Sequence, residues 1–369
     1  MNILITGANG FIGKNLVAEL KNKGYKDIFT VTKDTDRSLL DNYTNECDFV
    51  FHLAGVNRPR NEQEFIEENT NFTQFLLNSF KKNQNQSPIL FTSSIQALQD
   101  NPYGRSKRSC EQLLFSYEEE TGAKVLIYRL PNIFGKWCKP NYNSVIATFC
   151  HNIANGLDIH VNDPNTELTL GYIDDVIDEF LHALIGKESR HEVFCVLPKT
   201  YQIKLGQLAD KLYFFKTTRE SLLLPSFEKE FDRFLYSTYL SYLEENNFSY
   251  KLRKNTDHRG WLAEFIKSKE TGQIFISMTK PGITRGNHWH HTKVEKFLVI
   301  QGEAVIKLRK INSSKILEYH VSGDSLEVVD IPVGYTHSIE NIGNEDVITV
   351  FWACEIFNSE KPDTYYVEV

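Results

Sequence analysis

The sequence predicts an α/β domain with a doubly wound parallel sheet, followed by an all-β domain. In residues 1–130, short apolar runs alternate with helical stretches, which is typical of buried parallel strands with helices on both faces of the sheet. Beyond about residue 255, apolar runs follow one another at short intervals between Gly, Pro, Asn and Asp turns. The sequence pattern of residues 200–245 is typical of helices and rich in charged residues. We therefore expect two domains, 1–245 and 246–369.

The expected elements of the first domain follow from runs rich in Ile, Val, Phe and Thr, with helical spacing of apolar residues between them. Strands are expected at Ile3–Thr6, Ile28–Thr32, Phe49–Leu53, Ile89–Thr92 and Val125–Tyr128. Helices are expected near Gly13–Lys23, Glu62–Asn83 and Tyr103–Glu120. In the second domain, strands are expected at Trp261–Ile266, Ile274–Thr279, Lys296–Gln301, Ala304–Leu308 and Val347–Trp352.

Composition excludes several classes of protein. The 41 Lys and Arg against 48 Asp and Glu leave a net charge of −7, which argues against nucleic acid as a partner, because phosphate binding needs clustered cations. No apolar run reaches the ~18 residues of a membrane span, so no membrane insertion is expected. The start of the chain has no basic leader, and the six cysteines form no C-x-x-C pair. We expect free thiols and a cytoplasmic protein.

A glycine-rich turn directly follows the first expected strand and opens the first expected helix. Glycine lets the backbone approach a pyrophosphate, and the N–H groups at the helix start bind the anion. Strand, turn and helix fall where a Rossmann-type dinucleotide site requires them. The residues expected to bind the cofactor here are Gly7, Asn9, Gly10, Phe11, Ile12 and Gly13.

The end of the second expected strand favours NADPH over NADH. NAD-selective folds place a carboxylate there for the ribose hydroxyl, whereas this chain has Thr32 and Lys33, with Arg37 following. Cations suit a 2′-phosphate, although Asp34 and Asp36 are close by. The alternative is that the cations are solvated surface charges.

A tyrosine and a lysine four residues apart predict a proton relay. Tyr103 and Lys107 share one face of their helix. An ammonium beside a tyrosine favours the phenolate, so the pair can exchange a proton with a carbonyl oxygen during hydride transfer. Ser94 is expected to supply a further hydrogen bond, with Thr92 and Ser93 as alternatives.

The first two thirds of the chain resemble an extended short-chain dehydrogenase/reductase. The resemblance rests on the Gly-x-x-Gly-x-x-Gly start, the Ser-Ser strand end, Tyr-x-x-x-Lys, and the runs His52–Gly55, Arg129–Gly135 and Gly171–Val176. It implies that Leu53, Ala54, Gly55, Tyr103 and Lys107 also contact the cofactor. It further implies that Asn132 lies near the substrate, often a nucleotide-diphosphate sugar. The interval between Ser94 and Tyr103 is shorter than in extended members.

Three histidines and one glutamate predict a metal site in the second domain. His288 and His290 are two apart on an expected strand, so both point to one face. Glu295 follows a turn, and His337 comes from a distant strand. This set suits Zn, Fe, Ni or Mn, with Zn favoured because it is redox-silent and suits sets rich in His.

Around these residues the chain resembles the cupin family. The first motif is Gly282-x5-His-x-His-x4-Glu-x6-Gly302, and the second is Pro332-x-Gly-x-x-His-x3-Asn341, with its upstream glycine displaced to Gly323. The alternative is that these histidines pack without a metal, as in some sugar-epimerising cupins. Residues 257–264 resemble the entry segment of cupins that epimerise 4-keto-6-deoxy sugar nucleotides, which implies a phosphate contact for Arg259. The alternative for Arg259 is a salt bridge with Glu264.

Together the two halves resemble the bifunctional enzymes of capsular polysaccharide synthesis of the CapF or FnlB type. The resemblance implies that the cupin inverts C3 of a UDP-2-acetamido-2,6-dideoxy-4-hexulose and that the reductase then reduces C4 with NADPH. The product is a UDP-2-acetamido-2,6-dideoxy-talose, on a route to UDP-N-acetyl-L-fucosamine. It also implies a homodimer. Two alternatives are a reductase whose cupin is only structural, dimerising or ligand-sensing, and a redox sensor without turnover. For the epimerisation acid and base, His291, Lys296, Tyr335 and Glu264 remain open.

Overall fold

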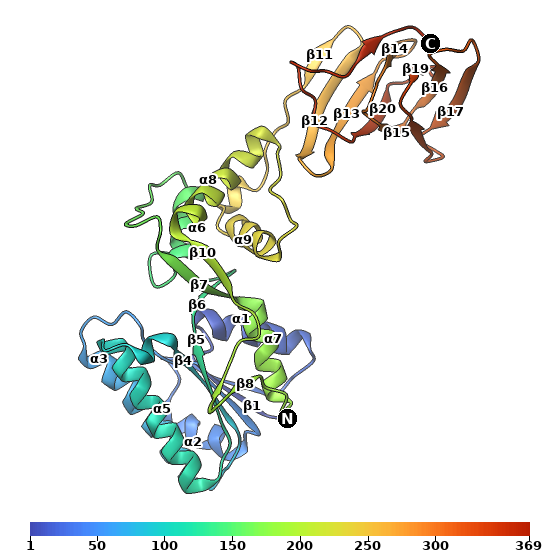
Figure 1. Ribbon diagram of the computed structural model, residues 1–369. Coiled ribbons are helices and arrows are strands. Elements are labelled where there is room, and N and C mark those ends of the chain that lie inside the picture. The colour runs from blue at the N-terminus through green and yellow to red at the C-terminus, as the bar shows by residue number, and fades with distance from the viewer. The chain divides into compact units, whose positions relative to one another are not determined.

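The computed structural model describes residues 1–369, except the side chain of Arg37. The chain divides into two compact units (Figure 1). Their segments are Met1–Leu212 with Phe234–Leu243 for the first unit, and Tyr213–Arg233 with Glu244–Val369 for the second.

The first unit is built on a seven-stranded sheet with the strand order β2-β1-β3-β4-β5-β9-β8. Neighbouring strands are parallel except for the β8–β9 pair. Their bounds are β1 Ile3–Thr6, β2 Ile28–Val31, β3 Phe49–His52, β4 Ile89–Ser94, β5 Val125–Leu130, β8 Arg190–His191 and β9 Phe194–Cys195. A second sheet has the order β10-β7-β6. Its strands are β6 Asn132–Phe134, β7 Glu167–Tyr172 and β10 Tyr201–Lys204.

Helices cover both faces of the larger sheet. The helices of the chain, not all of which cover this sheet, are α1 Phe11–Asn22, α2 Arg37–Glu46, α3 Gln63–Phe65, α4 Phe72–Lys82, α5 Pro102–Thr121, α6 Val145–Ala154, α7 Ile173–Leu184, α8 Leu205–Ser221 and α9 Glu230–Leu240. One buried cluster joins alternate strand residues such as Val50 and Ile127 to Leu77 of α4 and Leu114 of α5. On the other face, the ring of Phe180 from α7 lies against Phe51 and Tyr128. The predicted doubly wound parallel sheet is confirmed.

The helix expected over residues 62–83 differs from the prediction, because it is interrupted between α3 and α4. Residues Ile66–Asn71 form a π-helical turn there. Buried Asn69 uses its amide to accept from the Val56 N–H at 2.7 Å and to donate to Ser106 Oγ at 3.0 Å. A π-helical turn commonly occurs where a side chain has such a specific local role, and the spacing of apolar residues does not indicate it.

From residue 255 onward the second unit is all-β, as predicted, and contains two antiparallel sheets. One has the order β11-β12-β13-β20-β15-β18, with bounds Asn255–Asp257, Gly260–Ser268, Gly272–Thr279, Val347–Ala353, Glu295–Gln301 and Val328–Ile331. The other has the order β17-β16-β19-β14-β21, with bounds Ile316–Ser322, Glu303–Lys310, Tyr335–Asn341, Thr284–Trp289 and Tyr365–Tyr366. Phe297, Phe351, Ile306 and Ile339 from the two sheets share one buried cluster. The sheets therefore pack their apolar faces together.

The short interval between β4 and Tyr103 is bridged by one 3-10 turn, η2 Ile95–Leu98, before α5 begins. Asn101 caps α5 by accepting from the Gly104 N–H at 2.8 Å. A Cβ at Gly104 would lie 2.1 Å from the Gln96 carbonyl oxygen, which is far inside van der Waals contact. The glycine therefore lets α5 start directly beside the turn.

We expect Gly104→Ala to destabilise the first unit by about 1–3 kcal/mol, because the added methyl group must displace backbone rather than a mobile side chain. Alanine would otherwise favour the helix. Urea unfolding followed by circular dichroism measures the change. Ser116→Ala, on the exposed face of the same helix, is the control. A Gly104→Ala protein as stable as Ser116→Ala would contradict this packing.

Candidate functional site

A cavity of about 760 Å³ in the first unit brings together most of the predicted site. It lies where the glycine turn after β1, the end of β4 and the start of α5 meet. The predicted residues that line it are Gly7, Asn9, Gly10, Phe11, Ile12, Gly13, Leu53, Gly55, Ser94, Tyr103, Lys107 and Asn132. Of the other cofactor residues of the prediction, Thr32, Lys33 and Ala54 are outside this lining.

The glycine turn is packed so closely that side chains would not fit. Gly7 has φ +70°, and a Cβ there would lie 2.7 Å from the Ala54 backbone nitrogen. A Cβ at Gly13 would lie 2.3 Å from the Gly7 carbonyl oxygen. The N-cap of α1 is Gly10, which brings no side-chain acceptor to the first-turn N–H groups. That helix start can therefore receive a phosphate group.

Lys107 is a buried cation at the floor of this cavity, with 5% of its surface exposed. Its Nζ donates to the Thr92 carbonyl at 2.8 Å and lies 4.8 Å from the centre of the Phe91 ring. The centre of the Tyr103 ring is 5.9 Å from the same nitrogen. A Cβ at Gly55 would approach it to 3.2 Å. The lysine is thus held beside the tyrosine, as the predicted relay requires.

Buried His52 is kept neutral beneath the lysine. Its ring nitrogens lie 2.8 Å from Thr6 Oγ1 and 2.9 Å from Thr73 Oγ1. Burial, and then the positive charge of Lys107, lowers the pKa of His52 from 6.5 to about 3. A second positive charge next to the relay is avoided in this way.

The two serines at the end of β4 have different hydrogen-bond partners. Ser93 Oγ donates to Glu111 at 2.5 Å, and Glu111 also forms a two-pronged ion pair with Arg129. Both serines line the cavity, but Ser94 Oγ has only a weaker contact, accepting from the Gln96 N–H at 3.2 Å. The contacts therefore favour Ser94 over Ser93 as the hydroxyl available to a ligand.

At the end of β2, the predicted cofactor residues have local partners. The Thr32 N–H donates to Thr35 Oγ1 at 2.9 Å. Lys33 is exposed and lies 3.6 Å from Glu68. Arg37 was also predicted to contact the cofactor, but its side chain lies outside the described residues. Asp36 is turned to the start of α2, where it accepts from the Ser38 N–H at 2.9 Å.

The four predicted metal ligands meet inside the second unit. Their ligand atoms all lie within 4.8 Å of one another, and they are His288, His290, Glu295 and His337. Glu295 Oε2 is 3.4 Å from His290 Nε2 and 3.2 Å from His337 Nε2. A bulge in β14 between Gly286 and His288 adds a residue before the first ligand, as bulges that redirect side chains do.

The chemistry of this group fits a divalent cation. The Nε2 atoms of His290 and His337 are buried and have no hydrogen-bond partner among the described residues. Burial, and then the neighbouring His337, lowers the pKa of His288 to about 4. Burial raises the pKa of Glu295, but the nearby imidazoles of His290 and His337 outweigh it and hold that pKa well below its ordinary value. Neutral imidazoles around an ionised carboxylate are the forms that bind metal.

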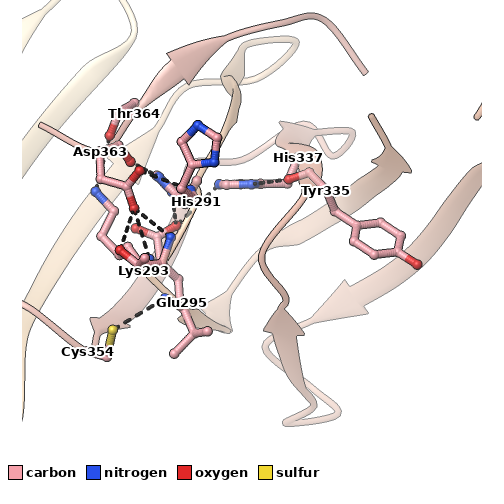
Figure 2. Close-up of polar contacts among 11 residues, drawn as sticks. His291, Lys293, Glu295, Tyr335, His337, Cys354, Asp363 and Thr364 are labelled. Atoms are coloured by element: carbon pink, nitrogen blue, oxygen red, sulfur yellow. Dashed lines mark hydrogen bonds and ion pairs between the residues drawn. The ribbon is translucent and has the colours of Figure 1, made fainter. Parts of the chain in front are cut away.

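The four candidates for the acid and the base of the epimerisation lie in different surroundings. Lys296 is exposed and pairs with Asp330 at 2.5 Å. Glu264 pairs with Lys267 at 2.9 Å. In Figure 2, the Tyr335 ring points away from Glu295 and His337. His291 is exposed, and its ring packs against Trp289 and Tyr365.

Arg259 does not form the salt bridge with Glu264 that the alternative proposed, since it pairs with Asp257 at 2.6 Å. The Asp257 carboxylate lies only two residues before the arginine and also accepts from its backbone N–H at 2.9 Å. Arg259 therefore pairs with this nearby carboxylate rather than with Glu264. The guanidinium and the backbone N–H of Arg259 together lower the pKa of Asp257 to about 2. Arg259 is still partly exposed and can meet a ligand.

Sequence reasoning missed part of the cavity wall. The further lining residues include Lys14, Asn57, Trp137, Lys139 and Tyr142. Lys139 lies with its Nζ 5.5 Å from the centre of the Tyr142 ring. The aromatic and basic residues directly after the Arg129–Gly135 run were the signal that could have found this segment.

The two units match known families. Residues 3–196 match the NAD dependent epimerase/dehydratase family, and residues 255–365 match the polysaccharide biosynthesis C-terminal domain. The chain is 44% identical to UDP-2-acetamido-2,6-beta-L-arabino-hexul-4-ose reductase of Pseudomonas aeruginosa, covering 100% of this chain and 99% of that protein.

The same match extends to solved structures. The capsular polysaccharide assembling protein CapF of Staphylococcus aureus is 51% identical, with a TM-score of 0.94 and full coverage of both chains. A structure of CapF with the inhibitor 3-isopropenyl-tropolone is 48% identical, with a TM-score of 0.90 and full coverage of both chains.

The fold and the glycine-turn cavity define the first unit as a nicotinamide-binding domain of the epimerase/dehydratase type. Over its whole length, the chain belongs to the CapF family of capsular polysaccharide synthesis enzymes.

We expect the free energy of unfolding of the first unit to fall with acid because of His52. Its folded pKa is depressed, so its contribution is complete above pH 6.5 and is lost as the pH falls toward 3, at about 1.4 kcal/mol per pH unit. Urea unfolding from pH 7 to pH 4 measures the slope. The slope of the unfolding free energy against pH should be less steep for His52→Gln. For His160→Gln, at an exposed site, the slope should match that of the wild type. Equal slopes in all three proteins would contradict the assignment.

Proposed function

We propose that this chain is a bifunctional nucleotide-sugar enzyme of capsular polysaccharide precursor synthesis. The second unit inverts C3 of a UDP-2-acetamido-2,6-dideoxy-4-hexulose, and the first unit reduces C4 with NADPH. The product is a UDP-2-acetamido-2,6-dideoxy-talose, on the route to UDP-N-acetyl-L-fucosamine. The observation that carries the proposal is the Tyr103–Lys107 pair in the cavity of the glycine turn, in a chain 44% identical to a UDP-sugar hexulose reductase.

In the reduction, the side chains of the first unit bind the carbonyl and deliver a proton. NADPH bound along the glycine turn supplies the hydride. Tyr103 donates its phenolic proton to the C4 oxygen, and the fixed charge of Lys107 stabilises the phenolate that remains. Ser94 donates a hydrogen bond to the same oxygen. Asn132, on the cavity wall, contacts the sugar nucleotide.

The order of the two steps follows from carbon acidity. The C3 proton is acidic only while C4 is a carbonyl, because the resulting negative charge spreads onto the carbonyl oxygen. Reduction of C4 removes that acidity and fixes the configuration at C3. Epimerisation must therefore precede reduction, and it needs a base on one face of the sugar ring and an acid on the other.

The second unit would hold a divalent cation, which we propose to be zinc, with His288, His290, Glu295 and His337 as ligands in a cupin barrel. The two partnerless Nε2 atoms support this assignment. Such an ion supplies Lewis-acid stabilisation to negative charge on a sugar oxygen. The tropolone inhibitor of CapF is consistent with a metal, because the two adjacent oxygens of a tropolone chelate cations. Arg259 would meet a phosphate of the UDP group.

The proposal also covers the domain boundaries, the oligomeric state and the location of the enzyme. We propose domains 1–245 and 246–369, a homodimer, and a cytoplasmic location. The free state of all six cysteines is consistent with a reducing compartment. No helix of the described residues is long and apolar enough to cross a membrane. The alternative function is an NADPH-dependent ketosugar reductase whose second unit is structural, dimerising or ligand-sensing.

The two activities should separate by substitution. In deuterated water without NADPH, the wild type should introduce deuterium at C3 of the keto sugar, as seen by NMR. Tyr103→Phe should slow NADPH oxidation by at least about 100-fold and keep this exchange. His288→Ala should lose the exchange. Tyr213→Phe, at an exposed site, is the control. A metal-loaded wild type that introduces no deuterium would favour the structural alternative.

Cofactor selectivity should depend on Lys33. Because its pair with Glu68 is exposed and weak, Lys33 can turn to a 2′-phosphate at little cost. Lys33→Ala should raise KM for NADPH by about tenfold, as expected for one charged hydrogen bond, and leave KM for NADH unchanged. Lys26→Ala is the control, since Lys26 is an exposed lysine before β2. Equal effects on both cofactors would contradict the NADPH assignment.

A further inference from the structure

We propose that Asp363 is a positioning residue for the metal centre. Its carboxylate fixes the loop between two ligands, and its backbone carbonyl orients the imidazole of His290. The inference rests on the metal site of the proposed function. No residue of the C-terminal segment stood out in the sequence, because Asp363 is 73 positions from His290.

The carboxylate of Asp363 binds every residue of the loop 291–293. Oδ1 accepts from the His291 N–H at 3.0 Å. Oδ2 accepts from the N–H of Thr292 at 2.9 Å, from its hydroxyl at 3.0 Å, and from the Lys293 N–H at 3.0 Å. Figure 2 shows this carboxylate facing the loop. Because the loop joins His290 to Glu295, the four hydrogen bonds set the separation of two ligands.

The backbone carbonyl of Asp363 acts on the ligand itself. His290 Nδ1 donates to this oxygen at 2.5 Å, which places the ring proton on Nδ1. Nε2 therefore keeps its lone pair and faces Glu295, 3.4 Å away. The ring is 2% exposed, so water does not compete for this contact. A carbonyl that fixes the tautomer and orientation of a ligating histidine is worth 10–100-fold in metal affinity in known sites.

The rest of the C-terminal segment is anchored independently of Asp363. Strand β21 pairs with β14, with Tyr366 opposite His288. Thr364 Oγ1 accepts from Lys293 Nζ at 3.1 Å, and the Val367 N–H donates to the Asn287 carbonyl at 3.0 Å. Removing the Asp363 carboxylate should therefore loosen the ligand loop and leave the strand in place.

The test compares zinc affinity in four full-length proteins: wild type, Asp363→Ala, Asp363→Asn and the control Glu360→Ala. Glu360 is an exposed acid on the same segment, and its side chain makes no hydrogen bond to the described residues. Each apoprotein is prepared with a chelator and titrated with zinc against a chromophoric competitor. We expect Asp363→Ala to bind zinc 10–100-fold more weakly, with Glu360→Ala equal to the wild type. The cobalt(II) absorption spectrum should change only in the Asp363 variants.

The outcomes separate the positioning role from the metal site. Unchanged unfolding midpoints of the apoproteins, together with weaker zinc binding, support the proposal. If Asp363→Ala does not fold, the zinc affinity of Asp363→Asn is the test instead, and it should also be weaker than that of the wild type. Zinc affinity of the folded Asp363 variant within twofold of the wild type overturns the positioning role alone. A wild type that binds no zinc, or binds it as well after His288→Ala, overturns the metal centre and this inference with it.

Discussion

Burial of the Lys107 ammonium is the constraint that organises the first unit. A buried cation must be hydrogen-bonded, and the Thr92 carbonyl at the end of β4 meets this need. A Cβ at Gly55 would press against this ammonium at 3.2 Å, and its charge adds to burial in lowering the pKa of His52. The glycine turn and the start of α5 close around the same point. One charge thus links the cofactor turn, the sheet edge and Tyr103 in a single cavity.

The second unit solves a similar problem with the opposite charge. Glu295 is a buried carboxylate, and the imidazoles of His290 and His337 surround it. Such a group is costly in an apolar interior unless cations or donors face it. A divalent ion would satisfy all four side chains together, which explains why nitrogen lone pairs are buried without a donor. Under the proposed function, carbon acidity and hydride delivery are handled in separate units, each with its own charge arrangement.

Local patterns were sufficient for most of the fold and for most of the candidate residues that the structure brings together at the two proposed sites. The turn Gly7–Gly13 and the pair Tyr103–Lys107 are encoded within a few positions, because glycine spacing and helical periodicity are local properties. The interruption of the helix at Asn69 was missed, since it follows from partners at Val56 and Ser106. Asp363 was missed for the same reason. Its role depends on strand β21 lying beside β14, a long-range pairing that no local pattern records.

The most direct test of this account is single-turnover oxidation of NADPH by wild type and Lys107→Met, with the UDP-linked 4-keto sugar as substrate. Fluorescence titration of NADPH would show that the variant still binds its cofactor. The account predicts that the variant reduces the sugar at least about 100-fold more slowly, because the phenolate of Tyr103 loses its counter-charge. A Lys107→Met protein that binds NADPH and reduces the sugar at the wild-type rate would contradict it.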